Sequence, residues 1–518
     1  MKEKLFKDIL SYYQINEDDY LLLTKEYDLS SFWNGAEFKY VDKAANVLKS
    51  VMNNKGKIVI YGDYDADGIM GVSILKKMFN YLNYEVGYYV PSRYIDGYGI
   101  TLERAKQFVE KGYSLVITVD NGISAFEPIE YLKNNNVKVI VIDHHLIGDK
   151  LPNCDAIVHP IYCESGLNSS GAFSAYVFAT NVLNRNDKYL SILASISLIS
   201  DSMPLIGYNR NFLKAVFKSY INDEFLNISL LCEGKKLNEE VVSSKVSPKI
   251  NSIGRMLENT SINNIIPFFT EENKDKVITY YDYICSVNSD RKTLSTNILQ
   301  NLNVDCSSSA IVEVLDVKEG LIGLLSTALL TKYHKPTIIF TLDNSKQNYK
   351  GSARSANGFN IVKAFDDLND LLVAYGGHQN AGGCTLPINN FEQFKKRFNE
   401  LANHIDEVVE EKTIPMNISD INKESYELIK TFSPFGEGWP KPQFKIEKIK
   451  SSSLNYSKTG EHIVTSLGNS SKIVGFNISK EMVSKYNFVD IIGDLDLNDF
   501  YATASIDFKI KQINESKI

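Results

Sequence analysis

Along the chain, short apolar runs alternate with amphipathic stretches of hydrophobic and polar residues. Three runs rich in β-branched and aliphatic residues lie at 57–61, 115–119 and 137–142, and each stops at polar residues. Stretches with helical spacing separate them, such as 72–82 and 102–111. Strands that are apolar almost throughout and alternate with helices are typical of a parallel sheet covered on both faces. The pattern therefore predicts an α/β domain in this part of the chain.

The pattern changes twice further along. Residues 208–300 are mostly helical in spacing, and a second α/β segment begins near 310 and runs to a glycine-rich stretch at 376–378. After about 410, short β-like runs alternate with turns, which favours a small barrel or sandwich. The first 40 residues are polar and aromatic and predict short helices that brace a domain. At roughly 100–200 residues per domain, 518 residues fit three domains.

Composition and charge exclude some classes of protein. With 44% hydrophobic and 23% charged residues the chain has the composition of a folded protein. The formal net charge of -7 excludes a generally basic nucleic-acid coat, but not a local basic channel. The start of the chain lacks the apolar segment of a signal peptide, and no apolar run reaches membrane-spanning length. We therefore expect a cytoplasmic protein without membrane contact.

Acidic residues and histidines follow each of the three predicted strands. They are Asp63, Asp65 and Asp67 after the first, Asp120 after the second, and Asp143, His144 and His145 after the third. Sites in parallel sheets form outside the carboxyl ends of the strands. One Asp after a strand is most often a turn or cap residue, but its occurrence after all three strands indicates a shared site.

The residue types at these positions favour hard divalent cations. Several carboxylates with an imidazole suit Mn²⁺ or Mg²⁺ better than structural zinc. Asp201 follows an apolar helix of small residues, and is either a helix-end residue or a further ligand. Two ions held about 3.5–4 Å apart by bridging carboxylates activate a water, and this water hydrolyses a phosphate ester. Neither a GxSxG elbow nor a P-loop is present, so the pattern favours a metal-dependent phosphoesterase.

Four segments resemble, in order, the motifs of the DHH phosphoesterase superfamily: Asp63-Tyr64-Asp65-Ala66-Asp67-Gly68, Thr118-Val119-Asp120-Asn121-Gly122, Asp143-His144-His145 and Ser200-Asp201. Further segments are similar to RecJ-type exonucleases of that superfamily: Val90–Arg93, Asp96–Gly99, Pro248–Asn251, Gly254-Arg255, Asn288 with Arg291, Gly320–Gly323, Gly351–Ser355, Gly376–His378 and Pro434–Gly438. The resemblance covers nearly the whole chain from about residue 40 onward.

The resemblance implies a 5′→3′ exonuclease that degrades single-stranded DNA, releases 5′-mononucleotides and serves DNA repair and recombination. It implies two bound ions, Mn²⁺ or Mg²⁺, with the metal ligands Asp63, Asp65, Asp67, Asp120, His144 and Asp201. The implied catalytic residues are His145 against the scissile phosphate, Asp143 orienting the histidines, and Asp67. The implied partners are single-stranded DNA, a single-strand-binding protein and a repair helicase, and we expect a monomer.

A second set of residues is expected to bind the nucleic acid. Gly376 and Gly377 let backbone N–H groups approach a phosphate and His378 can donate to it, although an isolated Gly-Gly-His is an ordinary turn. Arg354 offers a planar fork to a second phosphate, and it lies between Ser352 and Ser355. The residues expected along the DNA path are Arg93, Asn251, Arg255, Asn288 and Arg291. Helix capping is the alternative role for Asn251, Arg255, Asn288 and Arg291.

The resemblance also divides the chain into domains. A DHH domain with its N-terminal helical brace spans 1–210, a helical connecting segment 211–300, a DHH-associated substrate-binding domain 301–408, and an OB-fold that binds single strands 411–518. Candidate stacking residues in the OB-fold are Trp439, Phe444 and Tyr456, with Lys441, Lys448 and Lys450 beside them, although any one such aromatic is more often a core residue. Trp439 and Lys249 stand where the family usually has Asn and Arg.

Two other functions stay open at this point. One is a DHH-family phosphodiesterase for short oligoribonucleotides or cyclic dinucleotides, against which the β-rich tail argues. The other is a catalytically inactive DNA-binding scaffold, against which the intact acidic motifs argue.

Overall fold

The computed structural model describes residues 2–32, 38–163, 167–305, 307–343, 345–355, 358–403, 412–468, 471–498 and 504–516. The chain forms two compact units. Unit 1 consists of residues 1–27, 204–214 and 410–518, and unit 2 of residues 28–203 and 215–409.

The first sheet of unit 2 is wholly parallel, in the order β2-β1-β3-β4-β5. Its strands are β1 (Ile58–Tyr61), β2 (Gly87–Tyr89), β3 (Leu115–Val119), β4 (Lys138–Ile142) and β5 (Ala156–Val158). β1, β3 and β4 are the three predicted strands, and every residue of β1 and β3 is buried. The strand order reverses between β1 and β3, which opens a crevice at their carboxyl ends.

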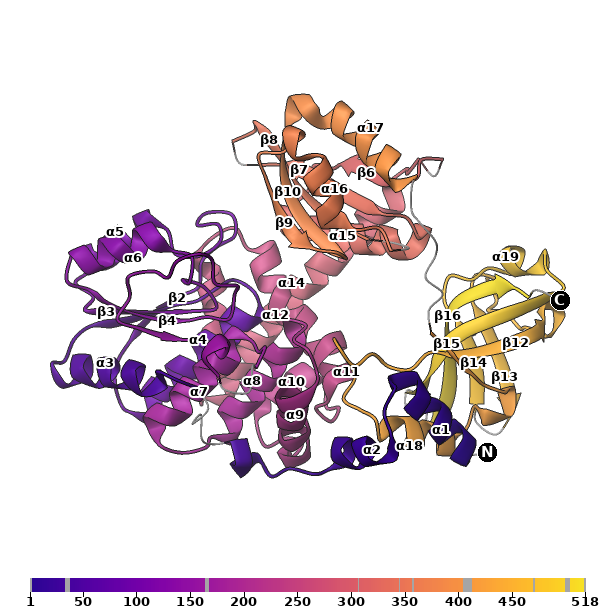
Figure 1. Ribbon diagram of the computed structural model, residues 1–518, viewed down its shortest axis with the longest axis horizontal. Coiled ribbons are helices and arrows are strands. Elements are labelled where there is room, and N and C mark those ends of the chain that lie inside the picture. Colours follow the sequence, from indigo (N-terminus) through magenta and orange to yellow (C-terminus); the bar gives the residue numbers. More distant parts are fainter. Residues whose placement is uncertain are drawn as a thin grey trace. The chain divides into compact units, whose positions relative to one another are not determined.

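Helices cover both faces of this sheet, which confirms the predicted α/β fold (Figure 1). The helices are α3 (Val41–Asn53), α4 (Ala66–Tyr81), α5 (Leu102–Glu110), α6 (Phe126–Asn134), α7 (Gly171–Leu183) and α8 (Lys188–Ser200). Helices α5 and α6 cover one face and share a core with the strands, whereas α3, α4 and α7 cover the other. Helix α4 also packs against α7 and α8 and is buried along most of its length.

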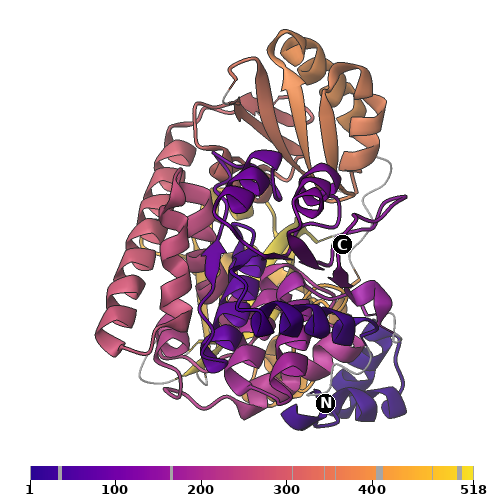
Figure 2. The same cartoon turned by 90° about the vertical axis from the view of Figure 1, so that its left-hand side faces the viewer.

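A helical segment joins this domain to the second sheet, as the periodicity of 208–300 predicts. Its helices are α9 (Gly207–Ser219), α10 (Leu226–Cys232), α11 (Glu239–Val241), α12 (Ser247–Met256), α13 (Ile265–Thr270) and α14 (Lys274–Asn301). A π-helical turn, Val242–Val246, connects α11 to α12. Helix α14 is the long rose-coloured helix at the left of Figure 2, and α12 packs against it.

The second sheet of unit 2 is mixed, in the order β6-β7-β8-β10-β9. Its elements are β6 (Ile311–Val314), α15 (Glu319–Tyr333), β7 (Thr337–Leu342), β8 (Asn348–Arg354), α16 (Ile361–Asp367), β9 (Ala374–His378), β10 (Ala381–Pro387) and α17 (Phe391–Ala402). One core contains residues of α16 and α17, and another contains residues of α15. Strand β9 lies at the edge of the sheet and is exposed throughout.

Unit 1 contains a six-stranded sheet in the order β11-β12-β15-β16-β14-β13. Its elements are β11 (Ile414–Pro415), α18 (Lys423–Lys430), β12 (Phe444–Lys450), β13 (Ile463–Gly468), β14 (Ser471–Gly475), α19 (Lys480–Ser484), β15 (Phe488–Asn498) and β16 (Ser505–Glu515). Strands β14 and β16 are parallel, and a bridge from Tyr456 to Ile463 brings the loop after β12 against β13. A small β-barrel with a helix before its fourth long strand is the predicted OB-fold.

The N-terminal helices α1 (Lys2–Tyr13) and α2 (Glu17–Thr24) belong to unit 1 and not to the DHH domain where the sequence placed them. Ile9 and Leu10 share a core with Phe432 and Phe444. Aromatic packing explains the difference, because the Tyr13 ring stacks on Trp439 with 4.0 Å between centroids. No local pattern in the sequence indicates that Tyr13 packs against Trp439. The other domain boundaries stay predictions.

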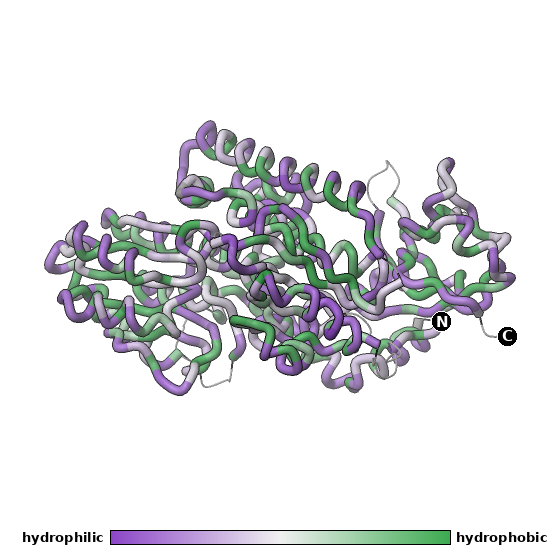
Figure 3. Tube along the Cα trace, turned by 90° about the horizontal axis from the view of Figure 1, so that it is seen from above, coloured by the Kyte–Doolittle hydropathy of each residue, from purple (hydrophilic) through white to green (hydrophobic). Residues whose placement is uncertain are grey.

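Within the described residues no helix is long and apolar enough to cross a membrane. Figure 3 shows hydrophobic and hydrophilic stretches interleaved along the trace. Cys154, Cys163, Cys232, Cys285 and Cys384 are free thiols, and Cys306 lies outside the described residues.

Candidate metal centre and phosphate-binding cavity

The turn between β1 and α4 carries the first three carboxylates. Asp63 is buried two residues beyond β1, and Asp65 caps α4 by accepting hydrogen bonds from the backbone N–H groups of Asp67 and Gly68 at 3.0 and 3.1 Å. A Cβ atom at Gly68 would lie 2.4 Å from the Asp63 nitrogen, so only glycine lets the helix approach this closely. The turn from β1 into the N-terminus of α4 thus brings these carboxylates together.

Asp67 is fixed by helices α7 and α8. Its two carboxylate oxygens accept hydrogen bonds from the backbone N–H groups of Gly171 and Ala172, both at 2.7 Å, at the first turn of α7. The Ser197 hydroxyl of α8 donates to it at 2.5 Å. The N-terminus of a helix carries partial positive charge, so this environment favours the ionised carboxylate.

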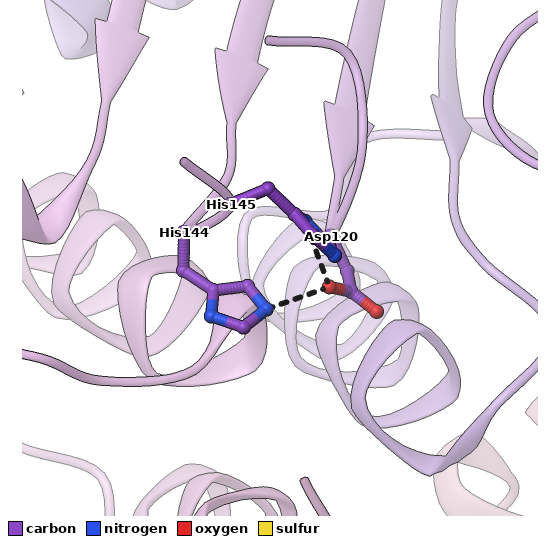
Figure 4. A group of neighbouring side chains, drawn as sticks. All are labelled: Asp120, His144 and His145. Carbon is purple, nitrogen blue, oxygen red and sulfur yellow. Dashed lines mark ion pairs between the residues drawn. The ribbon is translucent and has the colours of Figure 1, made fainter. Parts of the chain in front are cut away.

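His144 joins the carboxylates from three separate elements. Its Nε2 lies 3.2 Å from Asp120 Oδ1, and 3.5 Å from both Asp67 Oδ2 and Asp201 Oδ2. Figure 4 shows His144 and His145 directed toward Asp120 at the end of β3. Asp120 has a φ of 62°, a left-handed conformation that is uncommon for a residue with a side chain and is concentrated at functional sites.

Three overlapping groups of ligand atoms form one centre. In each group the potential ligand atoms lie within 4.8 Å of one another. The groups are Asp63, Asp65 and Asp120; Asp67, His144 and Asp201; and Asp120, His144 and His145. The structure therefore brings together all six residues that the sequence predicted as metal ligands, although their roles stay predictions.

Burial and mutual repulsion raise the pKa values of this centre. Burial raises the pKa of Asp63 and Asp120 well above their usual range, and the neighbouring carboxylates add to the shift. Burial followed by the charge of Asp67 raises the pKa of Asp201 to about 9 and raises that of Asp65 as well. A cluster of buried acids with raised pKa values requires compensating positive charge to stay ionised.

The chemistry of the donor set fits a divalent cation. Asp201 Oδ2 is buried and has no hydrogen-bond partner among the described residues, yet it lies among the carboxylates and His144. A buried unpaired carboxylate oxygen needs a cation or a donor. Oxygen ligands with an imidazole are suited to Mn²⁺ and Mg²⁺.

Asp143 and His145 form a second pair at the end of β4. His145 Nδ1 lies 2.8 Å from Asp143 Oδ1, and Asp143 also accepts a hydrogen bond from the backbone N–H of Ile123 at 2.9 Å. Burial lowers the pKa of His145, but the hydrogen bond and charge of Asp143 outweigh it and raise the pKa to about 9. Burial raises the pKa of Asp143, and the bonds from His145 reverse that effect and lower it. Asp143 therefore contacts His145, and its orienting role stays a prediction.

A cavity of about 480 Å³ in unit 2 is lined by Arg93, Arg255, Ser352 and Arg354. Arg93 lies over the Tyr64 ring at 4.3 Å, and its Nε has no hydrogen-bond partner among the described residues. Burial lowers the pKa of Arg255 to about 10, and the charges of Arg93 and other arginines contribute to the shift. Buried cations that repel one another are suited to an anionic ligand.

The remaining predicted binding residues fall in different places. Asn251 accepts a hydrogen bond from the Ala66 N–H at 2.9 Å, so it supports the first turn of α4 as its capping alternative suggested. Asn288 is buried and accepts from Arg291 Nη2 at 2.9 Å. The Ser355 hydroxyl donates to the Phe359 carbonyl and does not line the cavity.

The glycine-rich segment Gly376, Gly377 and His378 forms the exposed edge strand β9 and not a turn. Its neighbours Ala374 and Tyr375 line the cavity, whereas these three residues do not. Gly377 has a φ of 142°, and a Cβ atom there would lie 2.4 Å from the Ala381 carbonyl. Glycine is therefore required for the pairing of β9 with β10.

Sequence reasoning missed several side chains around the centre. The Tyr98 hydroxyl lies 2.9 Å from His145 Nε2, and Tyr98 is half exposed. The Asp-Gly-Tyr-Gly motif that contains it was the available signal. No signal in the sequence indicated that Ser197 holds Asp67. Lys249 is buried and bonds to Glu233 at 2.8 Å, so its difference from the usual Arg affects packing of the connecting helices.

The comparisons with known proteins agree with this geometry. Residues 57–199 match the DHH family, N-terminal domain, and residues 307–404 match the DHHA1 domain. The fold of this domain and the carboxylate–histidine centre, apart from Asp201, thus lie in the part of the chain that matches the DHH family, N-terminal domain. Residues 414–512 match the RecJ OB domain. The three domain models match in this order along the chain, so the chain is similar in domain order to RecJ-type proteins.

The chain is similar to relatives and to a solved structure over most of its own length, but it spans less than two thirds of the Bacillus subtilis relative. The chain is 28% identical over 507 residues to a single-stranded-DNA-specific exonuclease RecJ of Bacillus subtilis, and 29% identical over 468 residues to that of Haemophilus influenzae. These alignments cover 92% and 82% of this chain, and 63% and 81% of the relatives. A crystal structure of Thermus thermophilus RecJ in complex with Mn²⁺ matches with a TM-score of 0.81 at 22% identity, covering 99% of this chain and 78% of that one.

Proposed function

We propose that the chain is a metal-dependent 5′→3′ exonuclease that hydrolyses single-stranded DNA to 5′-mononucleotides. The observation that carries the proposal is the proximity of the arginine-lined cavity to the carboxylate centre. The charge of Arg93, which lines the cavity, acts on both Asp63 and Asp65. A terminal phosphate held in the cavity would place the adjacent phosphodiester bond at the centre, so the enzyme would cleave one nucleotide from the end.

The six clustered residues Asp63, Asp65, Asp67, Asp120, His144 and Asp201 would hold two ions, Mn²⁺ or Mg²⁺. Such ions, when bound, lower the pKa of a water and neutralise the oxygens of the attacked phosphate. The protein's own contribution is to fix the ligands. Hydrogen bonds from α7 and α8 hold Asp67, and the backbone conformation at Asp120 directs its carboxylate to His144.

His145 is proposed to lie against the scissile phosphate. Burial lowers the pKa of His145, but Asp143 outweighs burial and raises it to about 9, which favours the protonated imidazole at neutral pH. Asp143 holds Nδ1, so Nε2 is the nitrogen that would donate a hydrogen bond to a phosphate oxygen, in place of its 2.9 Å contact with the Tyr98 hydroxyl. Orienting a charged donor before the substrate binds favours the developing negative charge of the transition state.

Arg255, Ser352 and Arg354 are proposed to hold the terminal phosphate, and Asn288 and Arg291 to border the path of the strand. The Ser352 hydroxyl lies 3.0 Å from Arg354 Nη1 and orients its planar guanidinium. Unit 1 is proposed to bind the strand through its OB-fold. A single-strand-binding protein and a repair helicase are the proposed partners, in DNA repair and recombination, and the protein would act as a monomer.

Hydrolysis of labelled DNA tests the proposal. With Mn²⁺, we expect single-stranded DNA carrying a 3′ label to shorten from the 5′ end and to release mononucleotides. Asp120→Ala should remove this activity. A short RNA serves as the parallel substrate, because preferential cleavage of RNA would favour the oligoribonucleotide phosphodiesterase. A wild-type protein without nuclease activity, or an unaffected Asp120→Ala variant, contradicts the proposal.

The cavity makes a separate prediction for the 5′ end. Arg354→Gln removes one charged fork, so the preference for a 5′-phosphate over a 5′-hydroxyl should fall about 10-fold, the loss of one charge-assisted contact. Arg397→Gln is the matched control, since Arg397 pairs with Asp370 on the surface of the same domain. If Arg354→Gln and Arg397→Gln prefer a 5′-phosphate over a 5′-hydroxyl equally, the cavity does not bind the terminal phosphate. The measurement is kcat/KM on the two substrates.

A further inference from the structure

The loop of residues 92–99 reaches both the arginine-lined cavity and the metal centre of unit 2. It follows β2 and precedes α5. Arg93, near its start, lines the cavity. The Tyr98 hydroxyl, near its end, lies 2.9 Å from His145 Nε2. The conformation of this one loop therefore sets the places of two side chains that belong to different parts of the site.

The loop itself makes few packing contacts. Ile95 and Tyr98 are 61% and 53% exposed. Gly97 and Gly99 have φ values of 76° and 73°, and a Cβ atom at either position would have no neighbour within 4 Å. Exposed segments with few buried contacts are the ones that open most easily in a folded protein. Packing of the loop therefore does not explain why Tyr98 is held beside His145.

A buried carboxylate holds the loop from within. The Asp96 side chain is 4% exposed, and its Oδ2 accepts hydrogen bonds from the Ser92 N–H and the Tyr89 hydroxyl, both at 2.9 Å. Its Oδ1 lies 2.6 Å from Nη2 of Arg104, a residue of α5. The Asp96 N–H also donates to the Ser92 carbonyl at 2.8 Å. Asp96 therefore closes the first turn of the loop and ties it to both flanking elements.

Arg104 and two tyrosines complete the network. The Arg104 guanidinium lies over the Tyr89 ring at 4.0 Å, and its Nη2 donates to the Tyr89 hydroxyl at 2.6 Å. The Tyr89 ring stacks on that of the buried Tyr61, with 5.8 Å between centroids. The Tyr61 hydroxyl donates to the Gly99 carbonyl at 2.9 Å, at the other end of the loop. We call Tyr61, Tyr89, Asp96 and Arg104 the loop clamp.

The ion pair in the loop clamp has a role other than added stability. The desolvation of two buried charges offsets most of their attraction, and the better attested role of such pairs is to fix one conformation among several. The conformation fixed here also places the loop against the cavity, because the Tyr94 hydroxyl donates to the Arg255 carbonyl at 2.6 Å. Groups that bind or react need such support to stay in a productive geometry.

We propose that the loop clamp positions Arg93 for the terminal phosphate and, at the same time, positions the Tyr98 hydroxyl that orients His145. The proposal rests on the proposed function, because it assigns Arg93 and His145 to two phosphates of one strand. Within the described residues, the groups that could hold a metal ion include no residue of the loop clamp. Its residues are therefore positioning residues that act through the loop.

Hydrolysis by two clamp variants tests the proposal. Asp96→Asn keeps the size of the side chain and removes its charge. We expect kcat with Mn²⁺ to fall about 10-fold, as for other residues that orient a functional group. The preference for a 5′-phosphate over a 5′-hydroxyl in kcat/KM should fall about 3-fold, less than for a lost charge-assisted contact, because Arg93 is displaced and not removed. Tyr61→Phe keeps the ring, removes the bond to Gly99, and should change both quantities in the same direction.

Double variants separate positioning from general damage to the fold. If Asp96 acts on kcat through Tyr98, Asp96→Asn/Tyr98→Phe should match the single variants to within about 2-fold, whereas independent effects would multiply to about 100-fold. In an Arg93→Gln background, Asp96→Asn should not lower the 5′-phosphate preference further. Effects that multiply in both double variants overturn the proposal.

Asp155→Asn is the matched control, because Asp155 also joins a cation and a backbone N–H in the same domain. Its Oδ2 lies 2.7 Å from Lys133 Nζ and accepts a hydrogen bond from the Val139 N–H at 2.8 Å. We expect wild-type kcat and preference for this variant. Mn²⁺ should raise the melting temperature of Asp96→Asn as much as that of wild type. An equal loss of kcat in Asp155→Asn, or a lost Mn²⁺ response in Asp96→Asn, overturns the proposal.

Hydrogen exchange of the full chain in EDTA tests the loop clamp without hydrolysis. In Asp96→Asn the amides of residues 92–99 should exchange at least about 5-fold faster than in wild type, since an exposed loop without its support opens more often. Asp155→Asn should leave their exchange unchanged. If wild type hydrolyses no DNA, the proposed nuclease fails, and unchanged exchange in Asp96→Asn then overturns the loop clamp as well. If wild type is active and Asp96→Asn equals it in kcat and preference, only the loop clamp fails.

Discussion

At the scale of single residues, the carboxylates of the candidate metal centre repel one another. Asp67 is stabilised by two backbone N–H groups and a hydroxyl, whereas Asp201 Oδ2 has no hydrogen-bond partner among the described residues. The acids therefore differ in how much they depend on an added cation. Asp120 has the least favourable position, since it is buried, adopts a left-handed conformation and lies beside the other carboxylates.

Asp120→Asn should stabilise the protein in EDTA while removing activity. The raised pKa of Asp120 means that the folded state loses stability as pH rises above the unfolded value near 4, so the gain should be larger at pH 8 than at pH 5. We expect at least about 1 kcal/mol at pH 8, because one pKa unit corresponds to about 1.4 kcal/mol. Asn also tolerates the positive φ. Thermal denaturation at both pH values measures the effect, with the exposed Asp149→Asn as control.

Tyr98→Phe tests the contact that the sequence did not predict. Removing the hydroxyl leaves His145 Nε2 without its 2.9 Å partner but keeps the ring beside the imidazole. Residues that orient a functional group typically contribute about 10–100-fold, so we expect kcat to fall about 10-fold. The melting temperature should stay within about 1 °C, since surface substitutions are usually within about 0.5 kcal/mol. A variant with wild-type kcat would show that the hydroxyl does not orient His145.

At the scale of elements, the sequence predicted the strands that carry the centre and missed others. Strands β1, β3 and β4 are buried on both faces, so they appear as apolar runs with acidic ends. Strand β2 is only three residues long, and β15 has aspartates at 490, 494 and 496 that interrupt its apolar pattern. The proximity of Asp63, Asp120 and His144 was predictable because strand ends converge, whereas Asp201 follows helix α8 and the sequence pattern left its role open. The supporting contacts of Ser197 and Tyr98 were not predictable, since they depend on how α8 and a loop pack.

The close approach of α7 to β3 is required for the centre. A Cβ atom at Gly171 would lie 2.8 Å from Asp120 Cβ and 2.9 Å from its Cα, and Gly171 N–H also holds Asp67. Gly171→Ala should therefore separate Asp67 from Asp120 and reduce activity at least about 100-fold. Overpacking of this kind costs about 1–3 kcal/mol of stability.

Gly148→Ala is the matched control for this prediction. A Cβ atom at Gly148 would have no neighbour within 4 Å, and Gly148 follows the same group of motifs at the end of β4. We expect wild-type activity and stability for this variant. Mn²⁺-dependent hydrolysis and thermal denaturation measure both. If Gly171→Ala retains full activity, the spacing of α7 and β3 is not what aligns the carboxylates.

At the scale of the whole molecule, the acidic net charge belongs in part to the buried centre. The net charge of -7 includes the buried carboxylates of the centre, whose charge two divalent ions would change by about +4. Positive charge gathers instead at the arginine-lined cavity of unit 2. An acidic chain can therefore have a locally basic cavity, in line with the local basic channel that the net charge did not exclude.

The division into two units predicts separate responses to metal. All six clustered carboxylates and histidines belong to unit 2, so Mn²⁺ should raise the melting temperature of that unit alone. A ligand at 100 times its Kd adds about 2.7 kcal/mol, a shift of several degrees. In a Trp33→Phe variant Trp439 is the remaining tryptophan and reports on unit 1. We expect Mn²⁺ to raise the melting temperature measured by circular dichroism, and EDTA to lower it again. The melting temperature measured by Trp439 fluorescence should not change. A shared shift would show that the units unfold together.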